Sequence, residues 1–180
     1  RVGDTTSFAF VFDMNLIFQD FITNFIIRHR YKIFQDFNHK PFVNRQMGKK
    51  AMHLTFDLAT GNNHFPLKPD ILLDFPLSRI SRLVIDTKYK ILDPRKPSWG
   101  ISRNDVYQML AYSIGFTTEN LVLLYPRPIH QSLQKRLDIK SDDVDSRIFI
   151  QTVNLHQPLE NPKNMINEIK LIFKTILGGN

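Results

Sequence analysis

The sequence of 180 residues contains no cysteine, so disulfide bonds and thiolate metal sites are excluded. It also lacks a long apolar run. The longest, over residues 21–27, is interrupted by Thr23 and Asn24 and is too short to cross a bilayer. Neither a secretory signal nor a phosphate-binding loop of the GxxxxGK[ST] kind is present. We therefore expect a cytoplasmic protein without a membrane span that does not itself hydrolyse nucleotides.

The composition is that of a folded protein, with 42% hydrophobic residues and 15 phenylalanines. We expect one domain over residues 1–180. Because the sequence opens on Arg1 rather than methionine, we interpret it as the C-terminal fragment of a longer chain. The 24 lysines and arginines exceed the 17 acidic residues and give a net charge of +7. This excess favours a polyanionic partner such as DNA.

Hydrophobic spacing predicts a helix–strand alternation. Helices are expected over 13–30, from Ser102 to 114 with a stop at Gly115, and over 162–177. The expected N-caps are Asp13 and Ser102, and Asp105, three residues after Ser102, is a weak version of the capping pattern. Strands are expected over 53–59, 69–75, 82–92, 121–125 and 147–155, and residues 31–50 are read as a strand plus a loop. This order indicates an α/β fold with a central mixed sheet flanked by helices.

Two short motifs carry the chemistry. In an extended strand Asp86 and Lys88 share one face, and a hairpin through residues 76–81 would bring Asp70 beside Asp86. Both aspartates lie within apolar runs, where a charge requires an opposite charge or a metal. Two adjacent carboxylates repel each other, and bound Mg²⁺ relieves that repulsion because hard cations prefer oxygen ligands. The predicted metal ligands are Asp70, Asp86 and the Thr87 backbone carbonyl, with Mn²⁺ able to replace Mg²⁺.

Such a metal would polarise a phosphate and activate a water. Lys88 would orient that water and act as the catalytic base or as a charge stabiliser. Gln108 and Tyr112 lie four residues apart on one helix face and could contact the phosphate, the lysine or the water. The predicted catalytic set is therefore Asp70, Asp86, Lys88, Gln108 and Tyr112. Taken singly, each motif has a simpler explanation: an ion pair on a strand, a turn, or an incidental helix face.

The pattern resembles the restriction-endonuclease-like PD-(D/E)xK nucleases, with Asp70, Asp86 and Lys88 at the three motif positions. Gln108 and Tyr112 match the QxxxY feature of the RecB-type branch. The longer blocks over 12–18, 68–71, 86–90 and 105–112 resemble the McrC family, the cleavage subunits of modified-cytosine-dependent restriction systems. This resemblance covers roughly residues 10–125. It implies a restriction-endonuclease-like core, Mg²⁺-dependent cleavage of double-stranded DNA, and a GTP-dependent AAA+ motor as partner.

One position departs from the family pattern. The related chains tend to carry a glutamate in the first helix, whereas here Phe18 is followed by Gln19 and then Asp20. Either Gln19 supplies an amide oxygen, or Asp20 reaches round to the metal, or this ligand is absent. The number of metal ions is left open.

Other functions also remain open: a RecB-type exonuclease acting at DNA ends, a nuclease-like module that binds DNA or a partner without cutting, and an interaction domain with a chance motif. Basic residues near the motifs are predicted DNA phosphate contacts; they are Lys68, Lys90, Arg95, Lys96 and Arg103.

Overall fold

The computed structural model describes residues 11–45, 52–76, 82–128, 132–139, 145–156 and 161–178. The described helices are α1 (Met14–Ile33), α2 (Arg103–Phe116) and α3 (Lys163–Leu177), with a short 3₁₀ helix η1 (Pro97–Gly100). The described strands are β1 (Phe42–Arg45), β2 (Met52–Phe56), β3 (Asn63–Leu67), β4 (Ile71–Asp74), β5 (Arg82–Thr87), β6 (Asn120–Pro126), β7 (Lys135–Asp138) and β8 (Arg147–Val153). None of these helices is long and apolar enough to cross a membrane.

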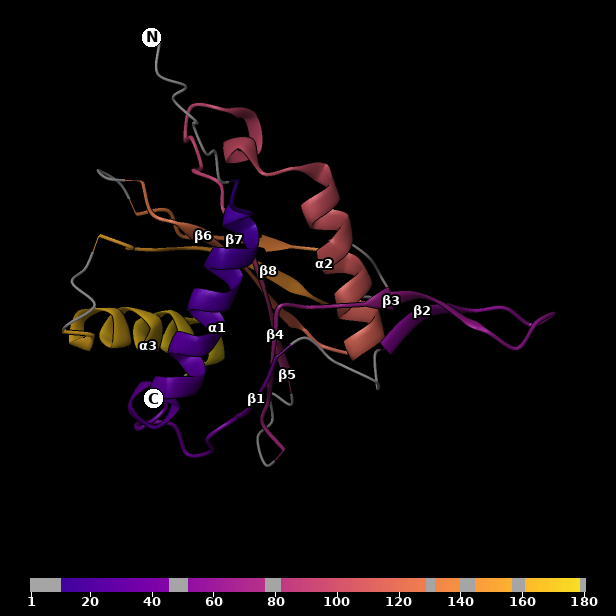
Figure 1. Ribbon diagram of the computed structural model, residues 1–180, viewed down its shortest axis with the longest axis horizontal. Coiled ribbons are helices and arrows are strands. Elements are labelled where there is room, and N and C mark those ends of the chain that lie inside the picture. Colours follow the sequence, from indigo (N-terminus) through magenta and orange to yellow (C-terminus); the bar gives the residue numbers. More distant parts are fainter. Residues whose placement is uncertain are drawn as a thin grey trace, which may run out of the picture.

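A six-stranded mixed sheet forms the centre of the fold, in the order β1-β4-β5-β6-β8-β7 (Figure 1). Strands β5, β6 and β8 run parallel, and β4 pairs antiparallel with β5. The outer strands β1 and β7 are also antiparallel to their neighbours. The predicted α/β fold with a central mixed sheet is therefore confirmed.

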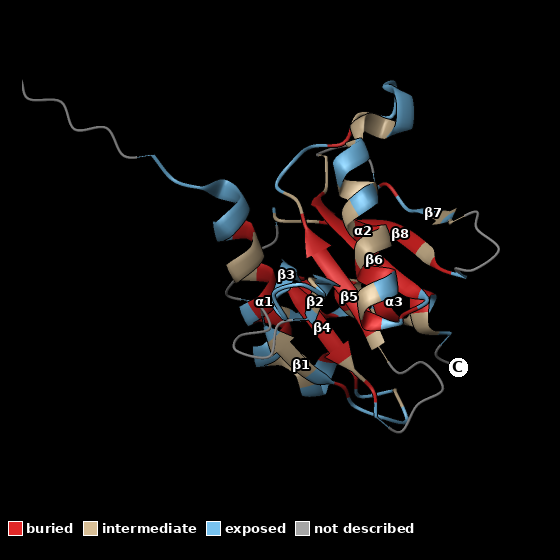
Figure 2. Cartoon of the chain, turned by 90° about the vertical axis from the view of Figure 1, so that its right-hand side faces the viewer, coloured by how far each residue is buried: buried red, intermediate tan, exposed pale blue. Residues whose placement is uncertain are grey.

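Helices cover both faces of the sheet and create two cores. Strand β5 alternates between them: Leu83 and Ile85 pack with α1 and α3, whereas Val84 packs with α2. Every residue of β6 is buried because its two faces are both covered, which produces the continuous apolar run in its sequence (Figure 2). Any charged side chain that projects from the middle of this sheet is consequently removed from water.

The helix starts follow the predicted capping residues. The Asp13 carboxylate accepts hydrogen bonds from the backbone N–H groups of Asn15 and Leu16 at the start of α1. Ser102 and Asp105 form a reciprocal capping box at the start of α2. Helix α1 continues to Ile33, beyond the predicted end at residue 30, so the first residues of the segment read as strand plus loop are helical.

The predicted stop of α2 at Gly115 is wrong. The helix continues to Phe116, and Thr117 adopts the left-handed conformation that ends it. Gly115 serves close packing instead, because a Cβ atom at this position would lie only 2.1 Å from Cδ1 of Leu67. The glycine thus allows the end of β3 to lie directly against α2.

Four predicted strands are shorter in the structure. Strand β2 ends at Phe56 rather than at residue 59, and β5 ends at Thr87 rather than at residue 92. Strand β8 ends at Val153 rather than at residue 155, and β4 occupies only Ile71–Asp74 of the predicted 69–75. After β5, Lys88 N–H still donates to the Leu124 carbonyl, but a tight turn from Lys90 N–H to the Lys88 carbonyl then diverts the chain. The predicted hairpin pairing of β4 with β5 is confirmed, although residues 77–81 of its turn lie outside the described residues, as do residues 46–50 of the segment read as strand plus loop.

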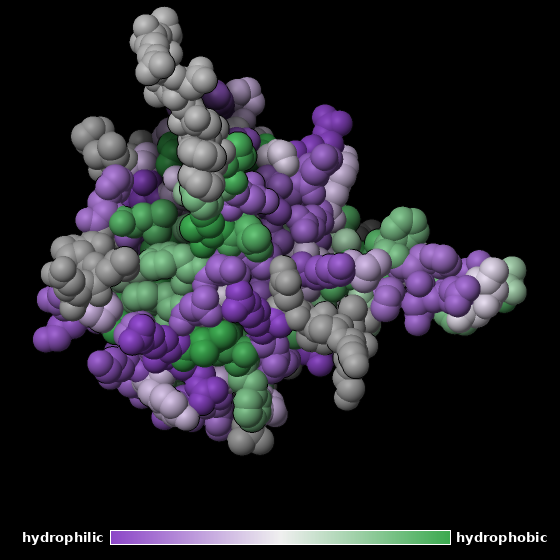
Figure 3. All heavy atoms as spheres, viewed as in Figure 1, coloured by the Kyte–Doolittle hydropathy of each residue, from purple (hydrophilic) through white to green (hydrophobic). Residues whose placement is uncertain are grey.

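Strands β3 and β7 were not predicted. β3 follows a turn signal and contains Pro66, and β7 is short and mostly charged, so neither shows strand periodicity. Strands β2 and β3 form a separate hairpin that contacts α2 and projects from the body (Figure 3). Its exposed apolar side chains are Met52, Leu54, Phe56 and Phe65, and Leu58 lies in the connecting loop.

Candidate functional site

The two predicted aspartates meet at one edge of the sheet. Asp86 is the penultimate residue of β5, and Asp70 immediately precedes β4. The ladder pairs Ile71 with Ile85, so the next position of the same register sets Asp70 opposite Asp86. The side chain of Asp86 is only 2% exposed and lies on the α2 face of the sheet with its neighbour Val84. The fold therefore juxtaposes two carboxylates in a mostly apolar environment.

Thr87 binds Asp70 through two groups. Oδ2 of Asp70 accepts a hydrogen bond of 2.7 Å from the Thr87 backbone N–H and one of 2.6 Å from the Thr87 hydroxyl. In an extended strand the N–H and C=O of one residue point to the same side. The Thr87 carbonyl, the predicted third ligand, is thus directed toward the side of the strand on which Asp70 lies.

Lys88 is surrounded by oxygen atoms. Its Nζ lies 2.6 Å from Oδ2 of Asp86, donates a hydrogen bond of 3.0 Å to Oε1 of Gln108, and lies 3.9 Å from Oδ1 of Asp105. The lysine side chain is 27% exposed, so its contacts are only partly screened by water. The predicted lysine and the predicted glutamine therefore lie in direct contact.

A chain of hydrogen bonds continues from Gln108 through Tyr112 to the backbone carbonyl of Lys68. Nε2 of Gln108 donates to the Tyr112 hydroxyl over 2.7 Å, and that hydroxyl donates to the Lys68 carbonyl over 2.8 Å. The same hydroxyl lies 3.5 Å from Oδ1 of Asp86. All five residues predicted as catalytic are therefore brought together by β4, β5 and α2.

Burial and mutual repulsion perturb the acidic groups. Burial, and then the negative charge of Asp70, raise the pKa of Asp86 to about 6. Burial also raises the pKa of Asp70, against the opposing effect of its Thr87 hydrogen bonds. For Lys88, burial lowers the pKa, but the charges of Asp86 and Asp105 outweigh it and the net shift is upward. The site thus disfavours the ionised form of both carboxylates and favours the protonated form of the lysine beside them.

This donor set fits a hard divalent cation. Asp86 Oδ2 is buried, and its close partner is the Lys88 ammonium at 2.6 Å. Two carboxylates and one backbone carbonyl are typical Mg²⁺ ligands when water or substrate phosphate completes the shell. Within the described ranges, no three acidic, histidine or cysteine side chains converge on one point. A cation here would depend on Asp70 and Asp86, with backbone and non-protein ligands.

The two candidates for a further ligand on α1 differ in their surroundings. The charge of Asp20 contributes to the raised pKa of Asp70, after burial, which places Asp20 near the pair. Asp20 also forms an ion pair with Arg45 of β1, and both side chains are 43% exposed. Gln19 is partly buried. Asp20 is thus the acidic candidate of the two and acts on Asp70 through its charge, whereas Gln19 would offer an amide oxygen.

Three further residues adjoin the site. Asp105, three residues before Gln108 on the same helix face, was identified in the sequence only as a helix cap. The Lys68 carbonyl and Asn15, whose Oδ1 accepts from the Tyr89 N–H over 3.1 Å, also bind site residues or their neighbours. Only the spacing of Asp105 gave a signal in the sequence, because the other two contacts join distant segments.

The basic residues predicted to contact DNA phosphates are all exposed; they are Lys68, Lys90, Arg95, Lys96 and Arg103.

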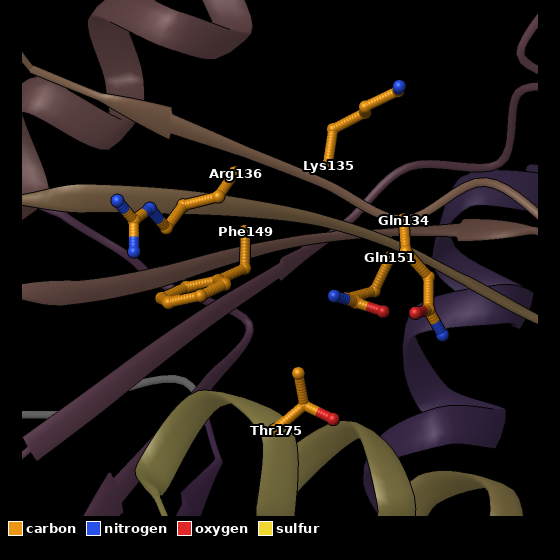
Figure 4. A pocket seen from close by; sticks show the side chains of 6 residues that line it. All are labelled: Gln134, Lys135, Arg136, Phe149, Gln151 and Thr175. Carbon is orange, nitrogen blue, oxygen red and sulfur yellow. The ribbon is translucent and has the colours of Figure 1, made fainter.

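A pocket of about 420 Å³ lies away from the carboxylate site, between β7, β8 and α3, on the face of β8 opposite to α2 (Figure 4). It is lined by Gln134, Lys135, Arg136, Phe149, Gln151 and Thr175, and none of them contributes to the carboxylate site.

Comparison with known proteins identifies the family of the chain. The family model described as "McrBC 5-methylcytosine restriction system component" matches residues 1–126. No curated protein matches the chain. Among solved structures, the chain is similar to one from the refined half-complex of a tetradecameric assembly of Thermococcus gammatolerans McrB AAA+ hexamers with bound McrC. The TM-score is 0.52 and the identity 18%, over 89% of this chain and 33% of that chain. The likeness shows a shared fold over one third of the larger chain.

Proposed function

The chain belongs to the McrBC 5-methylcytosine restriction system component family, and we propose that it is the metal-dependent DNA endonuclease domain of such a system. The observation that carries this proposal is the buried pair Asp70 and Asp86 beside Lys88. Burying two like charges is costly, and stability alone gives no reason for the pair. A divalent cation and a phosphodiester together provide one.

In the proposed mechanism, Asp70, Asp86 and the Thr87 carbonyl hold Mg²⁺ or Mn²⁺, and Asp20 is the candidate for one further ligand. When bound, the cation would polarise the scissile phosphate and lower the pKa of the attacking water. Thr87 also orients the Asp70 carboxylate, because its N–H and its hydroxyl both donate hydrogen bonds to one oxygen of Asp70.

Lys88 acts as a charge stabiliser. Its net upward pKa shift keeps it protonated near neutral pH, which favours an electrostatic role over that of general base. The ammonium would offset negative charge that accumulates on the phosphate during cleavage. Gln108 and Tyr112 hold the Lys88 ammonium in place, because the hydrogen-bonded chain that starts at Lys88 ends on the Lys68 backbone carbonyl.

We further propose that the substrate is double-stranded DNA carrying modified cytosine and that the partner is a GTP-dependent AAA+ motor. The family description names 5-methylcytosine restriction, and the similar solved chain is bound to AAA+ hexamers. The net charge of +7 and the exposed basic residues near the motifs support contact with phosphates. These 180 residues contain no GxxxxGK[ST] phosphate-binding loop, so the motor would lie outside them.

The test is cleavage of a supercoiled, cytosine-methylated plasmid by the chain with its AAA+ partner, GTP and Mg²⁺. We expect linear product from the wild type and none from Asp86→Asn. The exonuclease alternative predicts that only a pre-linearised plasmid is degraded. The non-catalytic alternative predicts that the wild type retards the plasmid on a gel without cutting it. Cleavage by Asp86→Asn at the wild-type rate would refute the site.

A further inference from the structure

Asp105 approaches Lys88 from the first turn of α2 and belongs to neither nuclease motif. On the basis of the proposed function, we propose that Asp105 is a positioning residue. It holds the Lys88 ammonium beside the scissile phosphate once a metal ion occupies Asp86. The geometry that motivates this is the triangle of oxygens around Lys88 Nζ, at 2.6 Å from Asp86, 3.0 Å from Gln108 and 3.9 Å from Asp105.

Asp86 cannot hold the lysine alone during catalysis. A divalent cation bound to Asp86 competes for the same carboxylate oxygens and repels the ammonium. Gln108 offers only a neutral acceptor. Asp105 is the one other carboxylate within ion-pair distance of Lys88 among the described residues, and its side chain is 17% exposed, so its attraction is only partly screened.

The two oxygens of Asp105 are divided between two tasks. Oδ2 accepts a hydrogen bond of 3.3 Å from the Ser102 N–H and completes the capping box, while Oδ1 faces Lys88. The cap therefore fixes the carboxylate and directs its second oxygen toward the site. The neutral phenol of Tyr125, buried near the end of β6, is a further neighbour of the Asp105 carboxylate: burial, the charges of Asp105 and Asp86, and a hydrogen bond with Asp105 raise its pKa.

The capping box permits a matched test. Glutamate and glutamine at this position both complete such a cap; they have nearly the same size, and only glutamate carries a charge. We therefore compare Asp105→Glu with Asp105→Gln in the plasmid cleavage assay with the AAA+ partner. We expect Asp105→Gln to lower kcat about tenfold, the size of effect given by loss of one partly buried charge contact. Asp105→Glu should restore most of the rate, and the Mg²⁺ concentration for half-maximal cleavage should stay unchanged in both.

Ser102→Ala controls for the cap. It removes the serine half of the capping box and leaves the Asp105 charge, so it should lower helix stability without lowering kcat. A purely structural role for Asp105 predicts the opposite pattern, in which Ser102→Ala reduces activity and Asp105→Gln, which keeps the cap, does not. Equal kcat values for the Glu and Gln variants would overturn the inference.

A second measurement does not depend on cleavage. In the ¹⁵N-lysine-labelled chain with saturating Mg²⁺, the NMR signal of the Lys88 ammonium, assigned from its loss in Lys88→Met, reports whether the group is ordered. We expect an ordered signal in the wild type and Asp105→Glu and a mobile one in Asp105→Gln. Equal order in both variants overturns the inference whatever the kinetics show. A wild type that fails to cleave, with this NMR difference present, refutes the proposed function alone.

Discussion

The replacement of Asp86 by asparagine tests the electrostatics of the site most directly. Asp86 has a pKa of about 6 in the folded chain, against its ordinary value of 3.8. At 1.36 kcal/mol per unit, this difference corresponds to about 3 kcal/mol of unfolding free energy. Because the side chain is 2% exposed, little of this effect is screened by solvent.

The direction of the pH dependence of stability follows from how tightly the folded and unfolded states bind the proton of Asp86. The raised pKa means that the folded state binds the proton more tightly than the unfolded state. The contribution of Asp86 to stability is therefore complete below pH 3.8 and is lost as the pH rises through 6. In the metal-free wild type, stability should fall by about 1 kcal/mol per pH unit near pH 5. Asp86→Asn does not titrate, so its stability should lack this decline.

The assay is urea denaturation followed by circular dichroism, in EDTA, at pH values from 4 to 8. The expected result is that the stability of Asp86→Asn relative to wild type rises by about 2.4 kcal/mol across this range. Asp36→Asn is the control. Ion pairs with Lys170 and Lys174 hold the pKa of Asp36 at about 2, so its contribution is constant above pH 5 and is lost only as the pH falls toward 2. Parallel curves for wild type and Asp86→Asn would refute the reasoning.

Four further predictions follow from contacts in the structure. Calorimetry should detect Mg²⁺ or Mn²⁺ binding by the wild type in the presence of a DNA oligonucleotide. Asp70→Ala and Asp86→Ala should both lose this binding, and binding that survives in either variant would contradict the shared site. The metal affinity should fall about tenfold per pH unit below pH 6, because the cation must displace the Asp86 proton; an affinity constant down to pH 5 would contradict this. Tyr112→Phe removes the hydrogen bond to the Lys68 carbonyl and should cost about 1 kcal/mol of stability and slow cleavage; an unchanged kcat would show that the hydroxyl has no part in placing Lys88. Asp13→Ala removes both N-cap hydrogen bonds of α1 and should cost about 1 kcal/mol in the urea assay without slowing cleavage.

The sequence contained enough information for the centre of the fold. Helix and strand periods differ, so apolar spacing separated α1, α2 and α3 from the buried strands. Capping residues fixed the helix starts at Asp13 and Ser102 to within one residue. Elements with weak sequence patterns were missed, because β7 is mostly charged and β3 contains a proline. The end of α2 was wrongly placed at Gly115, because this glycine allows close contact with Leu67 and does not end the helix.

For the site, the sequence by itself determined which residues share a face. A period of two places Asp86 and Lys88 together, and four residues along a helix align Gln108 with Tyr112. Only the tertiary structure decided the contacts that cross between elements. They include the Thr87 hydrogen bonds to Asp70, the nearness of Asp20 to that pair, and the approach of Asp105 to Lys88. Local periodicity governs the direction of a side chain along one element, whereas its distance to another depends on register, crossing and packing that no single segment encodes.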